Sequence, residues 1–541
     1  MKTMTISELL TLSPESIPSD TLFIGDKAEY EITEGDIKWL CAPIYTSFWD
    51  NGVYPFPAAV VLKNVRNVTL DFGGATLLLW GQYQPFLIEN CENVTIKNVT
   101  VVYARSPYTE LRILKNEKNC LYLQPLEKFP CRVEEGYLIP YGPTWENREL
   151  HLGNMFIQAF DTESGEGRGL AVCQIGEQIE QGATPPAFVR HYRVREENGA
   201  IVLTGEIPPE WDASMTIVLA HAKRDISSVF LICTKNSTLE NYRIVNGQGM
   251  GILGMYSENI TLDGLRLTRD EMSHGIVTNG ADAVHLVASK GQITVRNCLI
   301  EGMTDDALNV HTVFLEVSEC RDSSVKLLCH PQRHMIRANY KLLDIGDTLQ
   351  FYRGNTMETG ECAVVQNVTV LDDDHLEITL DKALSLHPGD YVENLSTQPD
   401  LLIENSRFAK SNTHLRIQTR GRVEVKSCEI HLPLMLTGDT NYWQEASPIR
   451  NLTVKNCRFS GDRGFIRSCP EFTATDDAPY YHKNFIIQNN TFDRTIALEA
   501  NGTDNIHFLN NIHAGSDAPL ILRLHRCGSA KTDASGIIER N

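Results

Sequence analysis

The chain has 541 residues, more than one compact domain needs, so either several domains or one elongated repeat is expected. Its 69 Asp and Glu residues outnumber its 49 Lys and Arg residues, which gives a net charge of −20. This balance argues against nucleic acid or an anionic membrane as the main partner. A neutral small molecule or a sugar is compatible with it.

The amino terminus lacks the sustained apolar core of a secretory signal, and no apolar run approaches the roughly 20 residues that span a bilayer. The 14 cysteines are scattered, without the paired spacing of a zinc site. A reduced cytoplasmic protein is therefore expected, and a trimmed form of an exported protein is the alternative. Residues 1–58, which include a helix-like ISELLTL segment, are expected to cap one end of the fold.

From Val60 onward the chain repeats one unit: alternating apolar residues, a turn at Asn, Asp, Ser or Gly, and a second short strand. Units beginning at Asn236 and Asn259 are 23 residues apart, and those beginning at Asn484 and Asn505 are 21 apart. This is the coil length of a parallel β-helix, in which Val, Ile and Leu stack inward. We interpret the Asn-X-Thr/Ser triplets as coil corners with left-handed backbone rather than as glycosylation sites.

Two stretches, 105–225 and 313–398, interrupt the repeat with alternating strands and β-turns, so each is predicted to be a small antiparallel β-barrel. Insertions from a solenoid often lie on its binding face, and the second one leaves directly after His311. The fold class is therefore all-β, a right-handed parallel β-helix with two inserted barrels. The predicted organisation is a cap region (1–58), first coils (59–104), a barrel (105–225), central coils (226–312), a second barrel (313–398) and C-terminal coils (399–541).

Three aspartates, Asp282, Asp305 and Asp306, lie just before short strand-like runs in the central coils. The 23 residues from Asp282 to Asp305 make about one coil, so the carboxylates should face one another across about 4.8 Å. Such crowding predicts that at least one of them has a raised pKa. A protonated acid beside an ionised base can cleave a glycosidic bond. A calcium site and ordinary structural corners remain the alternatives.

Other side chains on the same face are candidates for binding substrate. Asn309 and His311 alternate outward on the strand that follows the aspartate pair, which suits contacts to sugar hydroxyls. Arg416 either binds substrate or pairs with acidic neighbours. Trp443 and Glu445 lie in a long corner between coils, where the indole either stacks on a sugar ring or packs beneath the loop.

The segment TNGADAVHLVASKGQITVRNCLIEGMTDDALNVH (278–311) resembles the core motif of glycoside hydrolase family 110, a family of β-helix exo-α-galactosidases. Residues 67–101 and 441–459 are similar to further parts of that family, so the resemblance covers roughly 45–541. It implies inverting hydrolysis of a terminal α-galactoside, α-1,3-linked, without a metal or an organic cofactor. Asp282 would be the general acid, and Asp305 with Asp306 would hold and deprotonate the water.

The chain departs from the family pattern around the likely sugar contacts. His274 lies where family members carry an arginine-led stretch, and Thr312 follows His311 where they have glycine. The expected partner is an oligosaccharide or glycan, and a homodimer is compatible with the insertions. Two other functions compete: a pectin-type, polygalacturonase-like hydrolase, which would want Arg-x-Lys where this chain has Arg416-Ile417-Gln418, and a carbohydrate-binding solenoid without turnover.

Overall fold

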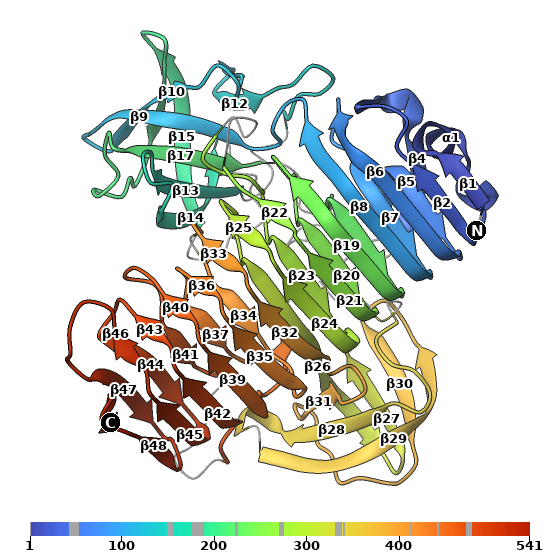
Figure 1. Ribbon diagram of the computed structural model, residues 1–541, viewed down its shortest axis with the longest axis vertical. Coiled ribbons are helices and arrows are strands. Elements are labelled where there is room, and N and C mark those ends of the chain that lie inside the picture. Colours follow the sequence, from blue (N-terminus) through green and yellow to red (C-terminus); the bar gives the residue numbers. More distant parts are fainter. Residues whose placement is uncertain are drawn as a thin grey trace.

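The computed structural model describes residues 2–42, 54–148, 155–175, 189–221, 226–269, 275–329, 338, 341–356, 358–411, 413–440, 443–471 and 479–540. Within these ranges the protein is a parallel β-helix with two barrels emerging from its coils (Figure 1). Its few helical turns are α1 (Ile6–Thr11) and the 3-10 turns Pro14–Ser16, Glu34–Asp36 and Gly354–Thr356. None of the described helices has the length and apolar character needed to cross a membrane.

Three ladders of parallel strands form the faces of the β-helix. The first ladder contains β1 (Lys2–Thr5), β2 (Thr21–Ile24), β6 (Arg66–Leu79), β8 (Glu92–Tyr103), β19 (Lys235–Ile244), β21 (Glu258–Asp263), β24 (Lys290–Arg296), β32 (Asp400–Glu404), β35 (Arg422–Lys426), β39 (Asn451–Lys455), β42 (His482–Gln488), β45 (Thr503–Leu509) and β48 (Ala530–Thr532). The second contains β3 (Glu29–Ile32), β22 (Arg266–Leu267), β25 (Leu299–Glu301), β33 (Arg407–Ala409), β36 (Glu429–Ile430), β40 (Arg458–Phe459), β43 (Thr491–Phe492) and β46 (Ile512–His513), and it shares the long strands β6, β8 and β19 with the first.

The third ladder carries the candidate site. It consists of β5 (Tyr54–Lys63), β7 (Gln84–Glu89), β18 (Val229–Ile232), β20 (Ile252–Met255), β23 (Val284–Val287), β26 (Leu308–Arg321), β34 (Leu415–Ile417), β37 (Leu434–Leu436), β41 (Ile466–Ser468), β44 (Ile496–Asn501), β47 (Leu520–His525) and β49 (Gly536–Arg540). One apolar core, from Ile6 to Cys527, fills the space between the ladders. Its inward Val, Ile, Leu and Phe side chains are the alternating apolar residues of the repeat.

The corner asparagines behave as predicted. Asn67, Asn93, Asn236 and Asn259 have φ between 53° and 57°, in the left-handed region that asparagine tolerates. Each later asparagine donates its side-chain N–H to the Oδ1 of the one before it, at 2.8 to 2.9 Å. The triplets are thus coil corners that bond along the solenoid.

The cap region is more regular than the sequence suggested. Helix α1 buries Ile6 and Leu9 against the core, and a capping box at Thr5 and Glu8 begins it. Strands β2 and β3 already pair with β6, so coil-forming strands precede residue 59. These strands lack the Asn-X-Thr corner by which the later coils are recognised, which is why the sequence pattern missed them.

Both insertions close into barrels. The first contains β9 (Thr109–Glu117), β10 (Cys120–Pro125), β13 (Met155–Asp161), β14 (Gly167–Ile175), β15 (Val189–Glu197), β16 (Ala200–Thr204) and β17 (Met215–Ala220), with a hairpin of β11 (Cys131–Glu134) and β12 (Tyr137–Pro140) beside it. The prediction of a wholly antiparallel barrel is wrong here, because β14 and β15 pair in parallel.

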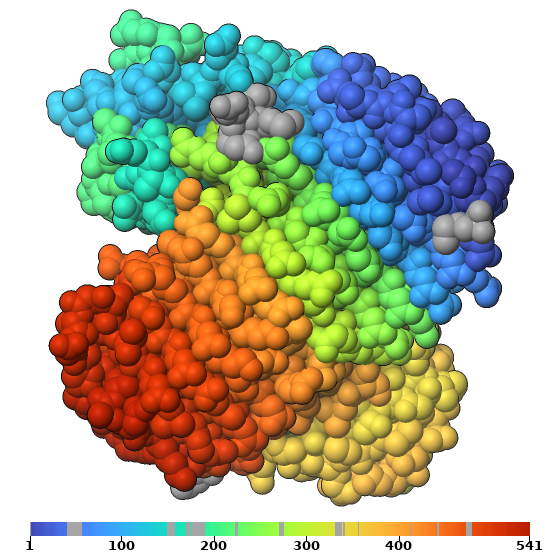
Figure 2. Space-filling view, viewed as in Figure 1, coloured from blue at the N-terminus to red at the C-terminus, as the bar shows by residue number. Residues whose placement is uncertain are grey.

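The second barrel is antiparallel throughout and includes part of a β-helix strand. It closes through β26, β27 (Ser324–Leu328), β30 (His375–Leu380), β29 (Glu358–Val370), β28 (Thr348–Arg353) and β31 (Tyr391–Asn394). In the space-filling view the teal first barrel and the yellow second barrel lie on either side of the green central coils (Figure 2). Strand β4 (Lys38–Ala42) pairs antiparallel with β5 at the N-terminal end of the third ladder.

Candidate active site

Asp282 and Asp306 lie side by side on neighbouring coils, each close to the start of a strand of the third ladder. The N–H of Ala283 donates to the carbonyl oxygen of Asp306 at 2.9 Å, which fixes their register. The two aspartates are 3% and 5% exposed, so both carboxylates are withdrawn from bulk water. The structure thus has a carboxylate pair on neighbouring coils, as the sequence predicts, and the residue beside Asp282 is Asp306 rather than Asp305.

A row of polar side chains continues from the aspartates along the ladder. His285 on β23 pairs with Asn309 on β26, which pairs with Arg416 on β34. His311 lies two residues beyond Asn309 on the same face of β26, opposite Val287. Three consecutive coils therefore bring a histidine, an amide and a guanidinium into one line beside the carboxylates.

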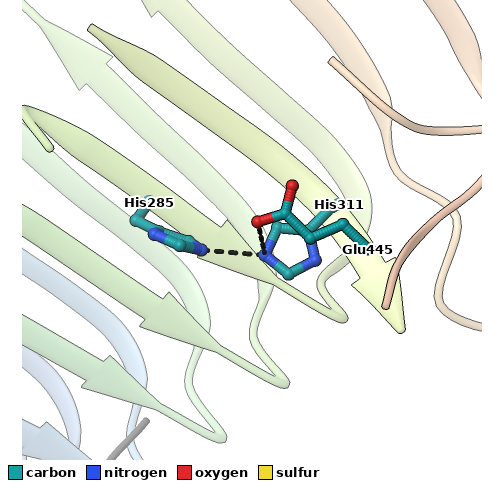
Figure 3. Close-up of side chains that lie close together, drawn as sticks. All are labelled: His285, His311 and Glu445. Atoms are coloured by element: carbon teal, nitrogen blue, oxygen red, sulfur yellow. Dashed lines mark hydrogen bonds and ion pairs between the residues drawn. The ribbon is translucent and has the colours of Figure 1, made fainter. Parts of the chain in front are cut away.

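Short contacts link the two histidines of this row to Asp282. The Nε2 atoms of His285 and His311 are 2.8 Å apart, and their side chains face each other in Figure 3. The Nδ1 atom of His285 is 2.7 Å from Oδ2 of Asp282. At the other end, Nδ1 of His311 is 2.6 Å from the carbonyl oxygen of Thr312. All of these side chains are buried.

Glu445 reaches the site from a separate short strand, β38 (Glu445–Ala446), which pairs antiparallel with β26. Its Oε1 accepts a hydrogen bond from the side chain of Asn309 at 3.0 Å and lies 3.6 Å from Nε2 of His311. Its Oε2 lies 3.6 Å from the guanidinium of Arg416. Glu445 therefore connects the histidines to the arginine.

Cations decide how the carboxylates titrate. Burial alone would raise the pKa of Asp306, but Arg416 at 3.3 Å and His414 at 3.4 Å outweigh it and hold that pKa at about 2. The same balance, in which His311 and Arg416 oppose the effect of burial, lowers the pKa of Glu445. The raised pKa expected for at least one of the crowded carboxyl groups is therefore not that of Asp306, because Arg416 on the next coil lies beside it.

Both barrels fix the segments that carry the site. In the first barrel, Glu110 accepts hydrogen bonds from the N–H groups of Ile276 and Val277 at 2.7 to 2.9 Å, just before the Asp282 loop. Gln158 of the same barrel donates to the carbonyl oxygen of Thr304, next to Asp305. In the second barrel, strand β26 runs without a break from Asn309 and His311 into the barrel wall. The insertions thus hold the site from two directions.

Glu110 gives the contact of the first barrel a pH dependence. Burial raises the pKa of Glu110 from 4.5 to about 7, against the opposing effect of the donated N–H groups. The folded protein keeps the proton of Glu110 up to a higher pH than the unfolded chain does. The free energy of unfolding therefore falls as pH rises from about 4.5 to about 7. Between these pH values the free energy of unfolding should fall by on the order of 3 kcal/mol because of Glu110, and we expect Glu110→Gln to abolish this part of the pH dependence. Calorimetric melting temperatures at pH 5 and 7.5 test it; equal slopes in both proteins would contradict it.

One cluster carries atom types that bind metals. Ligand atoms of His285, His311 and Glu445 lie within 4.8 Å of one another. Two nitrogen ligands of a tetrahedral zinc ion stand roughly 3.3 Å apart, whereas these Nε2 atoms are 2.8 Å apart and share a hydrogen bond. The hydrogen bond accounts for the cluster, so we assign no ion to it, and a site free of metal stays a prediction.

The remaining predicted residues have mixed outcomes. Asp305 is partly exposed, and its Oδ1 accepts the N–H of Asp306 at 3.1 Å. Trp443 packs against the apolar cluster between the third ladder and the second barrel, the second of its two proposed roles. His274 lies outside the described residues.

Sequence reasoning missed His285 and His414. A signal for His285 existed: it follows Asp282 by three residues, as Asn309 follows Asp306, so superimposing the two coils places it in the same row.

The chain was compared with known proteins. No family model matches it. It is similar to α-1,3-galactosidase B of Akkermansia muciniphila, with 27% identity over 84% of this chain and 57% of that protein. It is also similar to α-1,3-galactosidase A of Bacteroides fragilis, with 26% identity over 87% of this chain and 79% of that protein. The α-1,3-galactosidase B of Bacteroides thetaiotaomicron is 23% identical over 88% and 77%.

Solved structures are more distant. The alignment with a family 28 exopolygalacturonase of Yersinia enterocolitica includes 99% of this chain and 77% of the exopolygalacturonase chain. The sequence identity is 11% and the TM-score is 0.35, which is too low to bear on function. The chain spans little more than half of the Akkermansia relative and over three quarters of the Bacteroides relatives. The resemblance to β-helix α-galactosidases that the motif around Asp282 predicts is confirmed by relatives named α-1,3-galactosidase that align with most of this chain.

Proposed function

We propose that the chain is a glycoside hydrolase that removes a non-reducing terminal α-linked galactose, α-1,3-linked, from an oligosaccharide or glycan with inversion. The observation that carries this proposal is the buried carboxylate pair, Asp282 and Asp306, on neighbouring coils of the third ladder. Two carboxyl groups flanking the scissile bond are what glycosidic hydrolysis requires. The names of the relatives supply the sugar and the linkage.

In this mechanism Asp282 gives a proton to the leaving oxygen while the bond from that oxygen to the anomeric carbon breaks. A water held by Asp305 and Asp306 forms the new bond from the opposite face and passes its proton to their carboxylates. The low pKa of Asp306 suits this second role, because an ionised carboxylate can take a proton at neutral pH.

Asn309 is the clearest candidate contact for the sugar. Its side-chain N–H is occupied by Glu445, whereas its Oδ1 is buried and accepts no hydrogen bond from the residues that the structure describes. A buried acceptor of this kind is costly unless a donor reaches it, and a sugar hydroxyl would supply that donor. Arg416 and Glu445 border the same place and would bind further hydroxyls.

The pectin-type alternative fits this site less well. Binding a uronate requires a cation free to meet its carboxylate, whereas Arg416 already faces Asp306 and Glu445. The position that would carry a second cation holds Gln418, whose side chain donates to Thr437 at 2.8 Å. These contacts favour a neutral sugar.

Hydrolysis of 4-nitrophenyl α-galactoside and α-1,3-galactobiose, followed by proton NMR, tests the proposal. We expect β-galactose as the first product, which then mutarotates. An α-anomer appearing first would refute inversion, and turnover of another sugar but of no galactoside would refute the substrate. The cytoplasmic location and the homodimer stay predictions, to be tested by cell fractionation and by analytical ultracentrifugation.

A further inference from the structure

We propose that His285 is a positioning residue that shares the acid proton with Asp282, so that the Asp282–His285 pair, rather than Asp282 alone, stores the proton given to the leaving oxygen. The inference rests on the proposed function for its chemistry and on the contacts among Asp282, His285, His311 and Thr312 for its geometry. A general acid must hold a proton before the reaction. Arg416 and His414 offset the charge of Asp306, so repulsion from that carboxylate is not what holds the proton on Asp282, and His285 takes this role.

Two contacts assign protons to His311 and His285. The carbonyl oxygen of Thr312 can only accept, so the Nδ1 of His311, 2.6 Å away, carries a proton. Burial lowers the pKa of His311 to about 4, so this ring is neutral near pH 7 and its Nε2 accepts. The Nε2 of His285, 2.8 Å away, must therefore donate.

One proton remains to be placed, in the contact of 2.7 Å between Nδ1 of His285 and Oδ2 of Asp282. It lies on the nitrogen of an ion pair or on the oxygen of a neutral pair, and in both arrangements the two side chains hold it jointly. When two groups interact this closely, the measured pKa values belong to the pair. The acid of the proposed reaction is then the pair.

The surrounding charges keep that proton in place. The groups that face His285 are Asp282 from its own loop, His311 of β26, Glu445 of β38, and Asp306 with Arg416 from the following coils. Burial lowers the pKa of His285, but the carboxylates of Asp282, Glu445 and Asp306 outweigh burial and raise it. The contact of 2.7 Å and the carboxylates around His285 therefore keep the proton within the pair.

The proton balance is simple. As the glycosidic bond breaks, the one proton that the pair shares passes through the carboxyl group of Asp282 to the leaving oxygen, so Nδ1 of His285 is left without a proton. The imidazole ends neutral, the carboxylate ends ionised, and the leaving group departs as an alcohol. A proton from solvent then restores the pair before the next turnover.

His285→Asn tests this assignment, because an amide N–H can still donate toward Asp282 but cannot supply a proton. With 4-methoxyphenyl α-galactoside, whose leaving group needs protonation, we expect kcat/KM to fall by roughly 10²-fold or more. With 2,4-dinitrophenyl α-galactoside, whose leaving group needs none, we expect little change. The alkaline limb of the pH profile for the first substrate should move to lower pH. Equal losses on both substrates, or an alkaline limb that does not move down, would overturn the proposal.

Nitrogen NMR of the wild-type protein labelled with ¹⁵N-histidine gives a readout that needs neither activity nor the variant. We expect His311 as the neutral Nδ1–H tautomer, and His285 protonated on Nε2 with Nδ1 sharing a proton near pH 7. In Asp282→Asn, His285 should titrate at lower pH. These signals should persist in EDTA, since no ion is invoked. A His285 that titrates alike in both proteins would overturn the proposal, even if galactosides prove not to be substrates.

Discussion

Asp306→Asn is expected to lower kcat on α-galactosides by roughly 10²- to 10⁴-fold. The change removes the carboxylate that takes the proton from the attacking water and leaves Arg416 and His414 facing a neutral amide. Because water activation rather than leaving-group departure is impaired, the loss should be similar for 2,4-dinitrophenyl and 4-methoxyphenyl α-galactoside. Steady-state kinetics with both substrates measure it. Added azide, which attacks without needing a base, should restore part of the rate.

Asp263→Asn is the matched control. Asp263 ends β21 at a corner of the first ladder, where it accepts hydrogen bonds from Arg296 and Asn297 at 2.8 Å. It represents the alternative that the central aspartates are ordinary corners. We expect this variant to keep its kcat. If Asp306→Asn retained full activity, or if both variants lost it equally, the assignment of a base to Asp306 would be wrong.

The parallel β-helix could be predicted from the sequence because its physical cause is periodic. Each coil repeats alternating apolar residues and a corner asparagine. The distance between units such as those beginning at Asn236 and Asn259 therefore predicts both the length of a coil and which residues of neighbouring coils stack on each other. Strands β2 and β3 were missed because the corner before β2 is Asp20 rather than the asparagine of an Asn-X-Thr triplet, although Asp20 has the same left-handed backbone and accepts a hydrogen bond from Asn67. The parallel pairing of β14 with β15 could not be predicted, because apolar and polar residues alternate in the same way in parallel and antiparallel strands of a barrel.

The site was predictable only where it follows the coil period. Asp306 and Asn309 lie one coil beyond Asp282 and His285, and sequence spacing measures that distance along the chain. Glu445 arrives on an antiparallel strand, 136 residues along the chain from its hydrogen-bond partner Asn309, so no period places it there. The pKa of Asp306 depends on Arg416 from a later coil, so a count of carboxylates in the sequence does not determine which of them has a lowered pKa.

Glu393→Leu is expected to have the largest effect on stability. Glu393 lies on β31 of the second barrel and is fully buried, and its Oε1 accepts hydrogen bonds from Arg420 at 2.8 Å and Gln398 at 3.0 Å. Tyr352 donates to its other oxygen. Arg420 follows β34 in the β-helix, so this cluster fastens the barrel to the coil beside Arg416. Leaving a largely buried arginine without its carboxylate should cost about 3–5 kcal/mol, measured as a lower calorimetric melting temperature.

Two controls separate the buried charge from the lost packing. Glu361→Leu removes an exposed carboxylate that pairs with Lys382 at 2.8 Å in the same barrel, and it should leave the melting temperature unchanged. The double variant Glu393→Leu/Arg420→Leu removes both charges and should be more stable than Glu393→Leu alone, because the penalty arises from one unpaired charge. A double variant less stable than the single one would show that Arg420 stabilises the junction through other contacts. Because β26 carries Asn309 and His311 into this barrel, Glu393→Leu should also lower kcat below the melting transition, whereas Glu361→Leu should not.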